Sequence, residues 1–229
     1  MSKKVSLGIG SYAYAWNLGV PGYPAPKKRW TAFDLVEASR NFGLSVLELD
    51  DNVSLAEFSG DEIADLRRAA ESAGIQLEIG TRGTDPAQIE KYIGIAEKLG
   101  VSLLRSVFED KPKASDKSNG APTVLGDPEE EGLDFAKARL RESLPALESK
   151  GIVLALENYE RYSSAGLLSV VEALGSNHIG VCLDTVNSFG YPEDQKRVIE
   201  TLAPVTVNLH IKDFTIARLP HKMGFSLEG

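Results

Sequence analysis

The chain has 229 residues, 42% of them hydrophobic, which is enough to bury one sizeable core. Its 33 acidic and 25 basic residues give a net charge of −8, which disfavours attraction to nucleic acid or to an anionic membrane. One cysteine excludes a disulfide framework, no signal peptide is visible and no apolar stretch approaches the about 20 residues of a spanning helix, so we expect a soluble, cytoplasmic protein.

Short apolar runs alternate with amphipathic segments along the chain, which is the pattern of βαβ units around a parallel sheet. In chain order, the predicted strands are Val5–Gly10, Ser45–Leu49, Ile75–Ile79, Ser102–Phe108, Ile152–Leu156, Gly180–Leu183 and Val205–Leu209. Apolar residues between them recur at helical spacing. Three of the predicted helices are followed by a glycine, at Gly74, Gly100 and Gly151, where a left-handed residue ends a helix at low cost.

Two segments interrupt this alternation. The stretch from Glu109 to Glu131 is charged, contains several prolines and glycines, and lacks periodicity. We expect it to be a long loop at the C-terminal rim of the barrel, where loops of this length are either functional lids or disordered. The stretch from Trp16 to Trp30, which contains three prolines, is predicted to be a second rim loop.

The units together predict an α/β fold, a (β/α)8 TIM-type barrel that forms a single domain over residues 1–229. Seven strands account for the chain as far as Leu209, and the residues that follow have the character of a loop. The eighth strand and its helix are therefore missing from the pattern. We expect a barrel that lacks its last βα unit and is incomplete at its C-terminal end.

Each of the last three predicted strands leads into one side chain that can bind a metal: Glu157, Asp184 and His210. In a (β/α) barrel the carboxyl ends of the strands converge on one site. The spacings of 27 and 26 residues correspond to one βα unit each. Two carboxylates and one imidazole suit one divalent cation, and this ligand set does not select among Mn²⁺, Mg²⁺, Co²⁺ and Zn²⁺. The alternative is that the three residues are solvated strand ends.

The motifs around these residues resemble the xylose-isomerase-like barrel superfamily, which includes sugar-phosphate isomerases and epimerases, ketose 3-epimerases and endonuclease IV. The motifs are Glu157-Asn158, the segment 182–188 (Cys-Leu-Asp-Thr-Val-Asn-Ser) and the segment 210–214 (His-Ile-Lys-Asp-Phe). The resemblance extends in layout over the whole chain. It implies that Glu157, Asp184 and His210 bind one metal together with a final Glu, which would lie on the missing eighth strand.

Two departures from the family pattern narrow the function. Ketose 3-epimerases have a substrate-contacting histidine three residues after the metal-binding Asp, where this chain has Asn187. Asparagine can hydrogen-bond a sugar hydroxyl but cannot be protonated near neutral pH, so 3-epimerisation in particular is in doubt. Endonuclease IV implies a three-metal site with several histidines, which a chain with three histidines in all supports poorly.

Five further residues are candidates for substrate contact. Lys212 follows His210 and either contacts a carboxylate, phosphate or enolate or is a surface lysine. Arg105 interrupts a buried strand, so it forms an interior ion pair or binds an anion. Glu48 either pairs with Arg105 or binds substrate hydroxyls. Trp16 belongs to a sugar-facing wall or to the core. Arg218 closes on a phosphate or lies in an unstructured tail.

The function predicted from these residues is that of a metal-dependent isomerase or epimerase, which acts on a small sugar, sugar phosphate or keto sugar acid through an enediolate. Glu157 is the predicted ligand and proton shuttle, and Lys212 is the second catalytic candidate. Three alternatives stay open: a keto-sugar-acid dehydratase or decarboxylase, a metal-dependent phosphodiesterase or nuclease, and a non-catalytic sugar-binding barrel. We expect a small-molecule partner, no nucleic acid or membrane, and homo-oligomers formed through unpaired strand edges.

Overall fold

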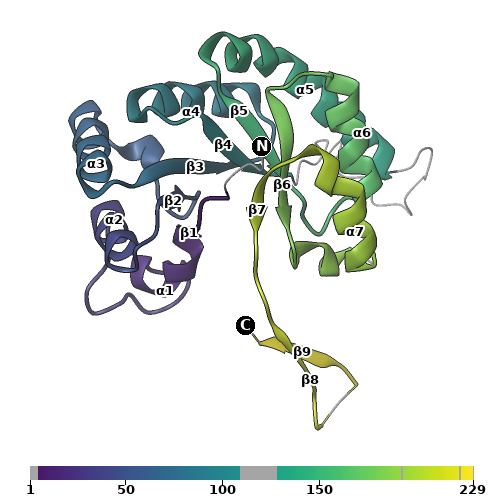
Figure 1. Cartoon of the computed structure of the whole chain (residues 1–229). Coiled ribbons are helices and arrows are strands. Elements are labelled where there is room, and N and C mark those ends of the chain that lie inside the picture. Colours follow the sequence, from purple (N-terminus) through teal and green to yellow (C-terminus); the bar gives the residue numbers. More distant parts are fainter. Residues whose placement is uncertain (1–4, 109–127, 192, 222, 229) are drawn as a thin grey trace, which may run out of the picture.

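The structure, a computed structural model, describes residues 5–108, 128–191, 193–221 and 223–228. Seven parallel strands form one curved sheet in sequential order, from β1 to β7, and helices line its outer side (Figure 1). The strands are β1 Gly8–Gly10, β2 Val46–Leu49, β3 Gln76–Arg82, β4 Leu103–Val107, β5 Val153–Glu157, β6 Ile179–Asp184 and β7 Thr206–His210. The helices are α1 Ala15–Leu18, α2 Ala32–Asn41, α3 Gly60–Ala73, α4 Pro86–Leu99, α5 Pro128–Lys150, α6 Ser164–Leu174 and α7 Gln195–Leu202.

The order of the strands confirms the predicted fold class. Each strand pairs in parallel with the next one along the chain, so the sheet curls as a TIM barrel does, with seven of the eight strands present in the part that the structure describes. Strands β1 and β7 form its two edges. No helix in the described ranges is long and apolar enough to cross a membrane.

Local sequence signals set the ends of several helices. Gly74, Gly100 and Gly151 adopt positive φ angles of 70°, 73° and 64°, as predicted for glycines that end a helix. At the start of α4, the Asp85 carboxylate accepts hydrogen bonds from the backbone N–H groups of Ala87 and Gln88. Pro86 occupies the first helical position, where no N–H donor is needed. These signals fix where each strand begins and thereby which residues reach the rim.

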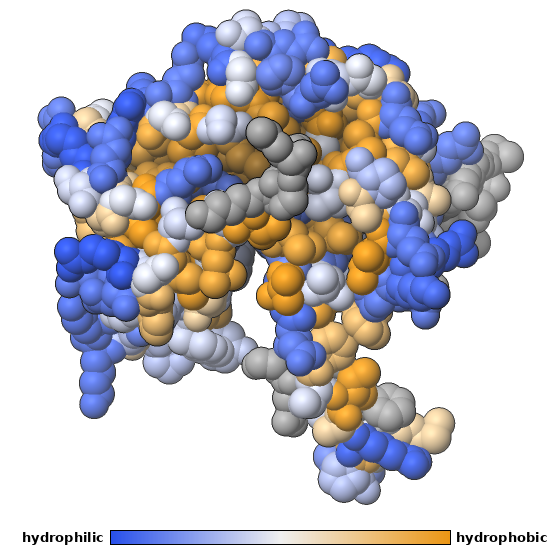
Figure 2. Space-filling model, in the orientation of Figure 1, coloured by the Kyte–Doolittle hydropathy of each residue, from blue (hydrophilic) through white to orange (hydrophobic). Residues whose placement is uncertain are grey.

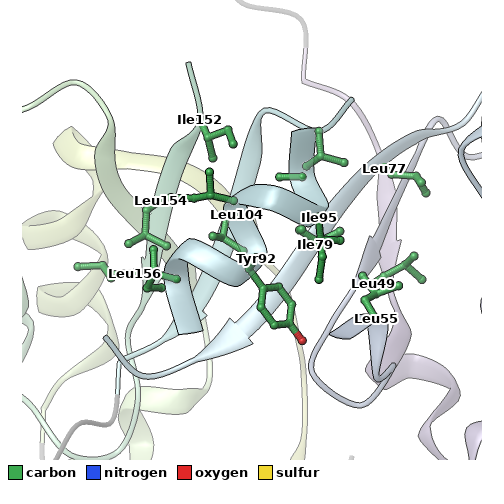
Figure 3. Close-up of a cluster of buried hydrophobic side chains, with 14 of the residues drawn as sticks. Leu49, Leu55, Leu77, Ile79, Tyr92, Ile95, Leu104, Ile152, Leu154 and Leu156 are labelled. Atoms are coloured by element: carbon green, nitrogen blue, oxygen red, sulfur yellow. The ribbon is translucent and has the colours of Figure 1, made fainter. Parts of the chain in front are cut away.

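The hydrophobic core lies between the sheet and the outer helices. Figure 3 shows part of it, where side chains from β2, β3, β4 and β5 meet those of α4. Leu49, Ile79, Leu104 and Leu154 are completely buried there. Because these residues point outward to the helices, the residues next to them in each strand point into the barrel, and several of those are charged.

Three predictions about loops need correction. The predicted loop from Trp16 to Trp30 begins within a helix, since α1 extends to Leu18. Residues 128–131 are not loop but the first turn of α5, where a proline in the first position and three glutamates favour the start of a helix. The rest of that predicted loop, residues 109–127, lies outside the described residues. The stretch after His210 is not loop either: β8 (Thr215–Arg218) and β9 (Phe225–Glu228) form an antiparallel hairpin that extends away from the barrel (Figure 1).

Strand β7 is polar toward the barrel interior and apolar on its outer face. Asn208 and His210 are partly buried, whereas Val207 and Leu209 are 46% and 48% exposed. Figure 2 shows hydrophobic surface across the middle of this face of the molecule, between hydrophilic outer regions. Strand β7 therefore presents apolar side chains that the described residues leave uncovered.

Candidate active site

The three predicted metal ligands are the last residues of three neighbouring strands. Glu157 ends β5, Asp184 ends β6 and His210 ends β7, and the parallel register places Asp184 opposite His210. Glu157 and Asp184 are buried, whereas His210 is partly exposed. His210 Nδ1 lies 3.5 Å from Glu157 Oε1 and 4.0 Å from Asp184 Oδ2. The structure therefore brings the three side chains together at one point of the rim.

Backbone groups and one buried amide hold Asp184 in place. Its Oδ1 accepts hydrogen bonds from the N–H groups of Val186 at 2.8 Å and Asn187 at 2.9 Å. The Asn158 side chain accepts from the Asp184 N–H at 2.7 Å and donates to the Asp184 carbonyl at 2.9 Å. With Oδ1 occupied in this way, Oδ2 is the oxygen that faces the centre of the site.

Arg105 lies in the barrel interior among four carboxylates. Its Nη1 is 3.2 Å from Asp50 and 3.3 Å from Asp51, its Nε is 3.9 Å from Glu48, and its Nη2 contacts Glu157 Oε2. The interior ion pair, one of the two alternatives for Arg105, is thus what the structure shows, and Glu48, for which this pairing was also one of two alternatives, is among its partners at 3.9 Å. Burial alone would lower the pKa of Arg105, but the carboxylates outweigh it and raise that pKa above its usual range.

Behind His210, two glutamates share one amide. Glu48 Oε1 lies 3.0 Å from His210 Nε2, and Asn208 Nδ2 donates to Glu48 Oε2 at 2.8 Å and to Glu78 Oε2 at 3.1 Å. Burial disfavours ionised Glu48, but His210 and Arg105 outweigh it and lower the pKa of Glu48 to about 2. Burial, and then the charge of Glu48, raise the pKa of Glu78 to about 7.

The pKa of His210 itself is held well above its ordinary value. Burial lowers it, but hydrogen bonds with Cys182, Glu157 and Glu48 outweigh burial and favour the imidazolium form. A cation bound beside Glu157 and Asp184 would take the place of this proton, because a metal needs a neutral imidazole nitrogen. The interior therefore already stabilises positive charge at this position.

At the rim, Lys212 and Asn187 cover the acidic cluster. Lys212 Nζ lies 2.6 Å from Asp184 Oδ2 and donates to Asn187 Oδ1 at 3.1 Å, and its side chain is 47% exposed. Asn187 Nδ2 in turn donates to Glu157 Oε1 at 2.8 Å. Both predicted residues therefore contact the predicted metal ligands, from the side open to solvent.

Trp16 and Arg218, two predicted substrate contacts, lie apart from this cluster. Trp16 is in α1, is 65% exposed and packs edge-on against Tyr23 with 5.1 Å between the ring centroids. Arg218 is exposed on β8, in the hairpin that extends away from the barrel (Figure 1). No described contact joins either residue to Glu157, Asp184 or His210.

Several residues of the cluster were not predicted as site residues, although Asn158 and Cys182 belong to the motifs that carry the family resemblance. They are Asp50, Glu78, Asn158, Cys182 and Asn208. Strand alternation was the available signal for four of them. Asp50, Cys182 and Asn208 lie two residues from Glu48, Asp184 and His210 in the sequence, and Glu78 pairs in register with Glu48 in the neighbouring strand. Cys182 Sγ lies within 4.8 Å of ligand atoms of Glu157 and His210, and burial raises the pKa of its thiol to about 12.

The cluster fits a divalent cation. Metal–ligand distances of about 2.0–2.3 Å place ligand atoms of one ion roughly 3–4.5 Å apart, which the separations of His210 Nδ1 from Glu157 and Asp184 satisfy. Among the described residues, the set whose ligand atoms all lie within 4.8 Å of one another is Glu157, Cys182 and His210, without Asp184. Glu48 Oε1, Glu157 Oε2 and Asp184 Oδ2 are buried oxygens without a well-aligned hydrogen bond. Each has an ion-pair partner instead: His210 Nε2 for Glu48, Arg105 Nη2 for Glu157, and Lys212 Nζ, at 2.6 Å, for Asp184. Buried carboxylate oxygens with incomplete hydrogen bonding are what a cation would satisfy.

A parallel β/α barrel with its polar residues gathered at the carboxyl ends of the strands is the architecture of the TIM barrels. A sequence profile of the xylose isomerase-like TIM barrel family matches residues 36–226, and the chain belongs to this family. The resemblance seen in the sequence is thereby confirmed.

Three similar proteins illustrate the relationship. The chain is 33% identical over 225 residues to 3-oxo-isoapionate decarboxylase of Pectobacterium atrosepticum, and the aligned region covers 98% of this chain and 74% of that protein. The structure of D-psicose 3-epimerase with D-tagatose from Clostridium cellulolyticum H10 has a TM-score of 0.69 at 18% identity, covering 91% of this chain and 73% of that one. A xylose isomerase-like TIM barrel protein from Mycobacterium smegmatis in complex with magnesium has a TM-score of 0.64 at 18% identity, with coverages of 86% and 71%.

Proposed function

We propose that the chain is a metal-dependent enzyme that decarboxylates a small 3-oxo sugar acid, with Glu157, Asp184 and His210 as metal ligands. The observation that carries this proposal is the group of incompletely hydrogen-bonded, buried carboxylate oxygens around His210, with the ammonium group of Lys212 beside them. The 33% identity to a protein named 3-oxo-isoapionate decarboxylase supports the same reaction class. When bound, a divalent ion would supply Lewis-acid polarisation of the ketone oxygen.

Lys212 is the residue that would hold the substrate carboxylate and later return a proton. Its half-exposed side chain can pair with an anion from the solvent side while Asn187 Oδ1 accepts a hydrogen bond from Nζ. As the C–C bond to the carboxylate breaks, CO₂ leaves and the bonding electrons move toward the ketone oxygen. Lys212 Nζ would then protonate the carbon that lost CO₂, and solvent would restore the proton to Nζ.

Asn187 and Arg105 would keep Glu157 in position. Asn187 bridges Lys212 and Glu157 through its amide, and an amide can also hydrogen-bond a hydroxyl of a sugar. Arg105 contacts the other oxygen of Glu157. In this arrangement Glu157 is a ligand whose direction is set by its neighbours.

Isomerisation or epimerisation of a small sugar is the second candidate. The favouring observation is Glu157 Oε1, which lies at the centre of the cluster and could take a C–H proton instead of only binding the metal. Epimerisation also calls for proton return on the opposite face of the substrate. Among the described residues, the other carboxylates nearest the rim are paired, Asp184 with Lys212 and Asp51 with Arg82 and Arg105.

A reaction in D₂O separates the two candidates. The protein, with Mn²⁺ and a 3-oxo sugar acid, should release CO₂ and leave deuterium on the carbon that lost it. We expect Lys212→Met to lower the rate by about 100-fold or more, as for loss of a general acid. Lys196→Met, which removes an exposed lysine of α7, is the matched control and should keep full activity. Deuterium uptake into intact sugar without CO₂ release would favour the epimerase instead.

A further inference from the structure

We propose that Glu48 is a positioning residue for His210: it fixes the imidazole ring so that Nδ1, and not Nε2, binds the metal. The inference rests on the proposed function, because it takes His210 as a ligand. The sequence suggested a substrate contact for Glu48, and the geometry supports this different role.

The two nitrogen atoms of His210 face different partners. Nδ1 points to the other two proposed ligands, at 3.5 Å from Glu157 Oε1 and 4.0 Å from Asp184 Oδ2. Nε2 points away from them, to Glu48 Oε1 at 3.0 Å. A neutral imidazole carries its proton on one nitrogen only, and an ionised carboxylate can only accept. Contact with Glu48 therefore places the proton on Nε2 and leaves the Nδ1 lone pair for the metal.

Glu48 is itself held firmly. Its side chain is 5% exposed, and Asn208 Nδ2 donates to its Oε2 at 2.8 Å. The other oxygen, Oε1, has no well-aligned donor: the contact with His210 Nε2 is short but imperfectly directed, and Arg105 Nε is 3.9 Å away. A small rotation of the His210 ring toward a bound metal could improve this alignment without any movement of Glu48.

The position of Glu48 in its strand also argues against direct contact with substrate. Glu48 lies one residue before the end of β2, and its side chain is 5% exposed, whereas that of His210 is 18% exposed. The His210 ring lies between two carboxylates, because Nε2 contacts Glu48 and Nδ1 faces Glu157. A sugar at the rim would meet His210 and its metal before it reached Glu48.

Zinc binding followed by NMR tests the proposal, with Zn²⁺ as the probe and the 229-residue chain as the protein. Nitrogen-15 spectra of the histidine rings, with His210 identified by loss of its signals in His210→Ala, should show metal on Nδ1 and a proton on Nε2. Glu48→Ala should weaken Zn²⁺ binding by about 10- to 100-fold, the usual effect of losing the hydrogen-bond partner of a metal-binding histidine. It should also allow coordination through Nε2.

Two further variants separate positioning from a general structural role. Glu48→Gln keeps one carbonyl oxygen, and because His210 and Asn208 face different oxygens of Glu48, one of the two donors loses its acceptor; we expect an intermediate loss of affinity with Nδ1 still bound. Glu78→Gln is the matched control, since Glu78 shares the Asn208 donor but has no described hydrogen bond with His210, and it should bind Zn²⁺ as the unaltered protein does. If Glu48→Ala fails to fold, the Zn²⁺ affinity of Glu48→Gln is the test, and an affinity equal to that of the unaltered protein would overturn the positioning role.

The outcomes also separate this inference from the proposed function. Zn²⁺ on Nε2 of the unaltered protein would overturn the positioning role. Unchanged affinity in a folded Glu48→Ala, together with lost affinity in His210→Ala, would do the same and leave the proposed metal site intact. Unchanged affinity in His210→Ala would overturn the metal site and the positioning role together.

Discussion

Replacing Arg105 with methionine should destabilise the protein strongly, because it leaves several buried carboxylates without their shared cation. The Arg105 side chain is 5% exposed, its Nη2 contacts the buried Glu157, and its Nη1 lies 3.3 Å from Asp51 Oδ1. Two unit charges at that distance attract by about 5 kcal/mol at an effective dielectric constant of about 20. Removal of one partner from a buried pair generally costs about 3–5 kcal/mol, and we expect Arg105→Met to lower the free energy of unfolding by that amount.

Urea unfolding followed by circular dichroism, at pH 7.5 and with EDTA present, measures this loss. Arg68→Met is the matched control, since Arg68 pairs with Asp65 on the exposed face of α3 and should contribute less than about 1 kcal/mol. The loss in Arg105→Met should shrink as the pH is lowered, because the unpaired carboxylates then become protonated. A loss for Arg105→Met no larger than that of Arg68→Met would refute the view that this guanidinium balances the interior acids.

Three further predictions follow from the same structure. The pKa of Glu78 is raised from 4.5 to about 7, so its stabilising contribution is present below pH 4.5 and is lost as the pH rises through 7. Glu78→Gln removes the cost of ionising this buried group, so its free energy of unfolding, measured by urea titration, should exceed that of the unaltered protein by up to about 3 kcal/mol at pH 8 and be little changed at pH 4. With a net charge of −8, the protein should not cleave abasic-site DNA, and metal-dependent incision abolished by Asp184→Ala in a gel assay would contradict the sugar-acid proposal. The exposed Val207 and Leu209 should make the 229-residue chain self-associate in size-exclusion chromatography; if Leu209→Lys elutes no later than the unaltered chain, the outer face of β7 is not the cause.

Most of the architecture could be predicted because parallel barrels carry a simple sequence pattern. Apolar strands, amphipathic helices and the glycines between them located all seven strands of the sheet to within a few residues. The hairpin after His210 could not be found in this way, because β8 and β9 are short, and β8 is exposed and has no core face to impose an alternation. The start of α5 was missed because Pro128 is compatible both with a loop and with a first helical turn.

The site residues that lie at strand ends could be predicted from the sequence. The contacts that arise because the sheet curls could not. Glu157 and Asp184 could be placed at the rim because each follows an apolar strand. The contact of Glu48 with Asn208 joins residues 160 positions apart, from β2 and β7, and exists because the sheet curls and brings these strands across from each other. Side-chain alternation indicates which residues face the interior, but it does not indicate which of them meet there.

Anomalous X-ray scattering from crystals of the protein grown or soaked with MnCl₂ tests the central claim most directly. We predict one manganese peak per chain at the C-terminal rim, at about 2.0–2.3 Å from Glu157, Asp184 and His210 Nδ1, with Lys212 displaced from Asp184 Oδ2. Crystals of Asp184→Ala should lack this peak. A manganese ion bound elsewhere, or a peak of equal height in Asp184→Ala, would contradict the assignment of these three residues as the metal site.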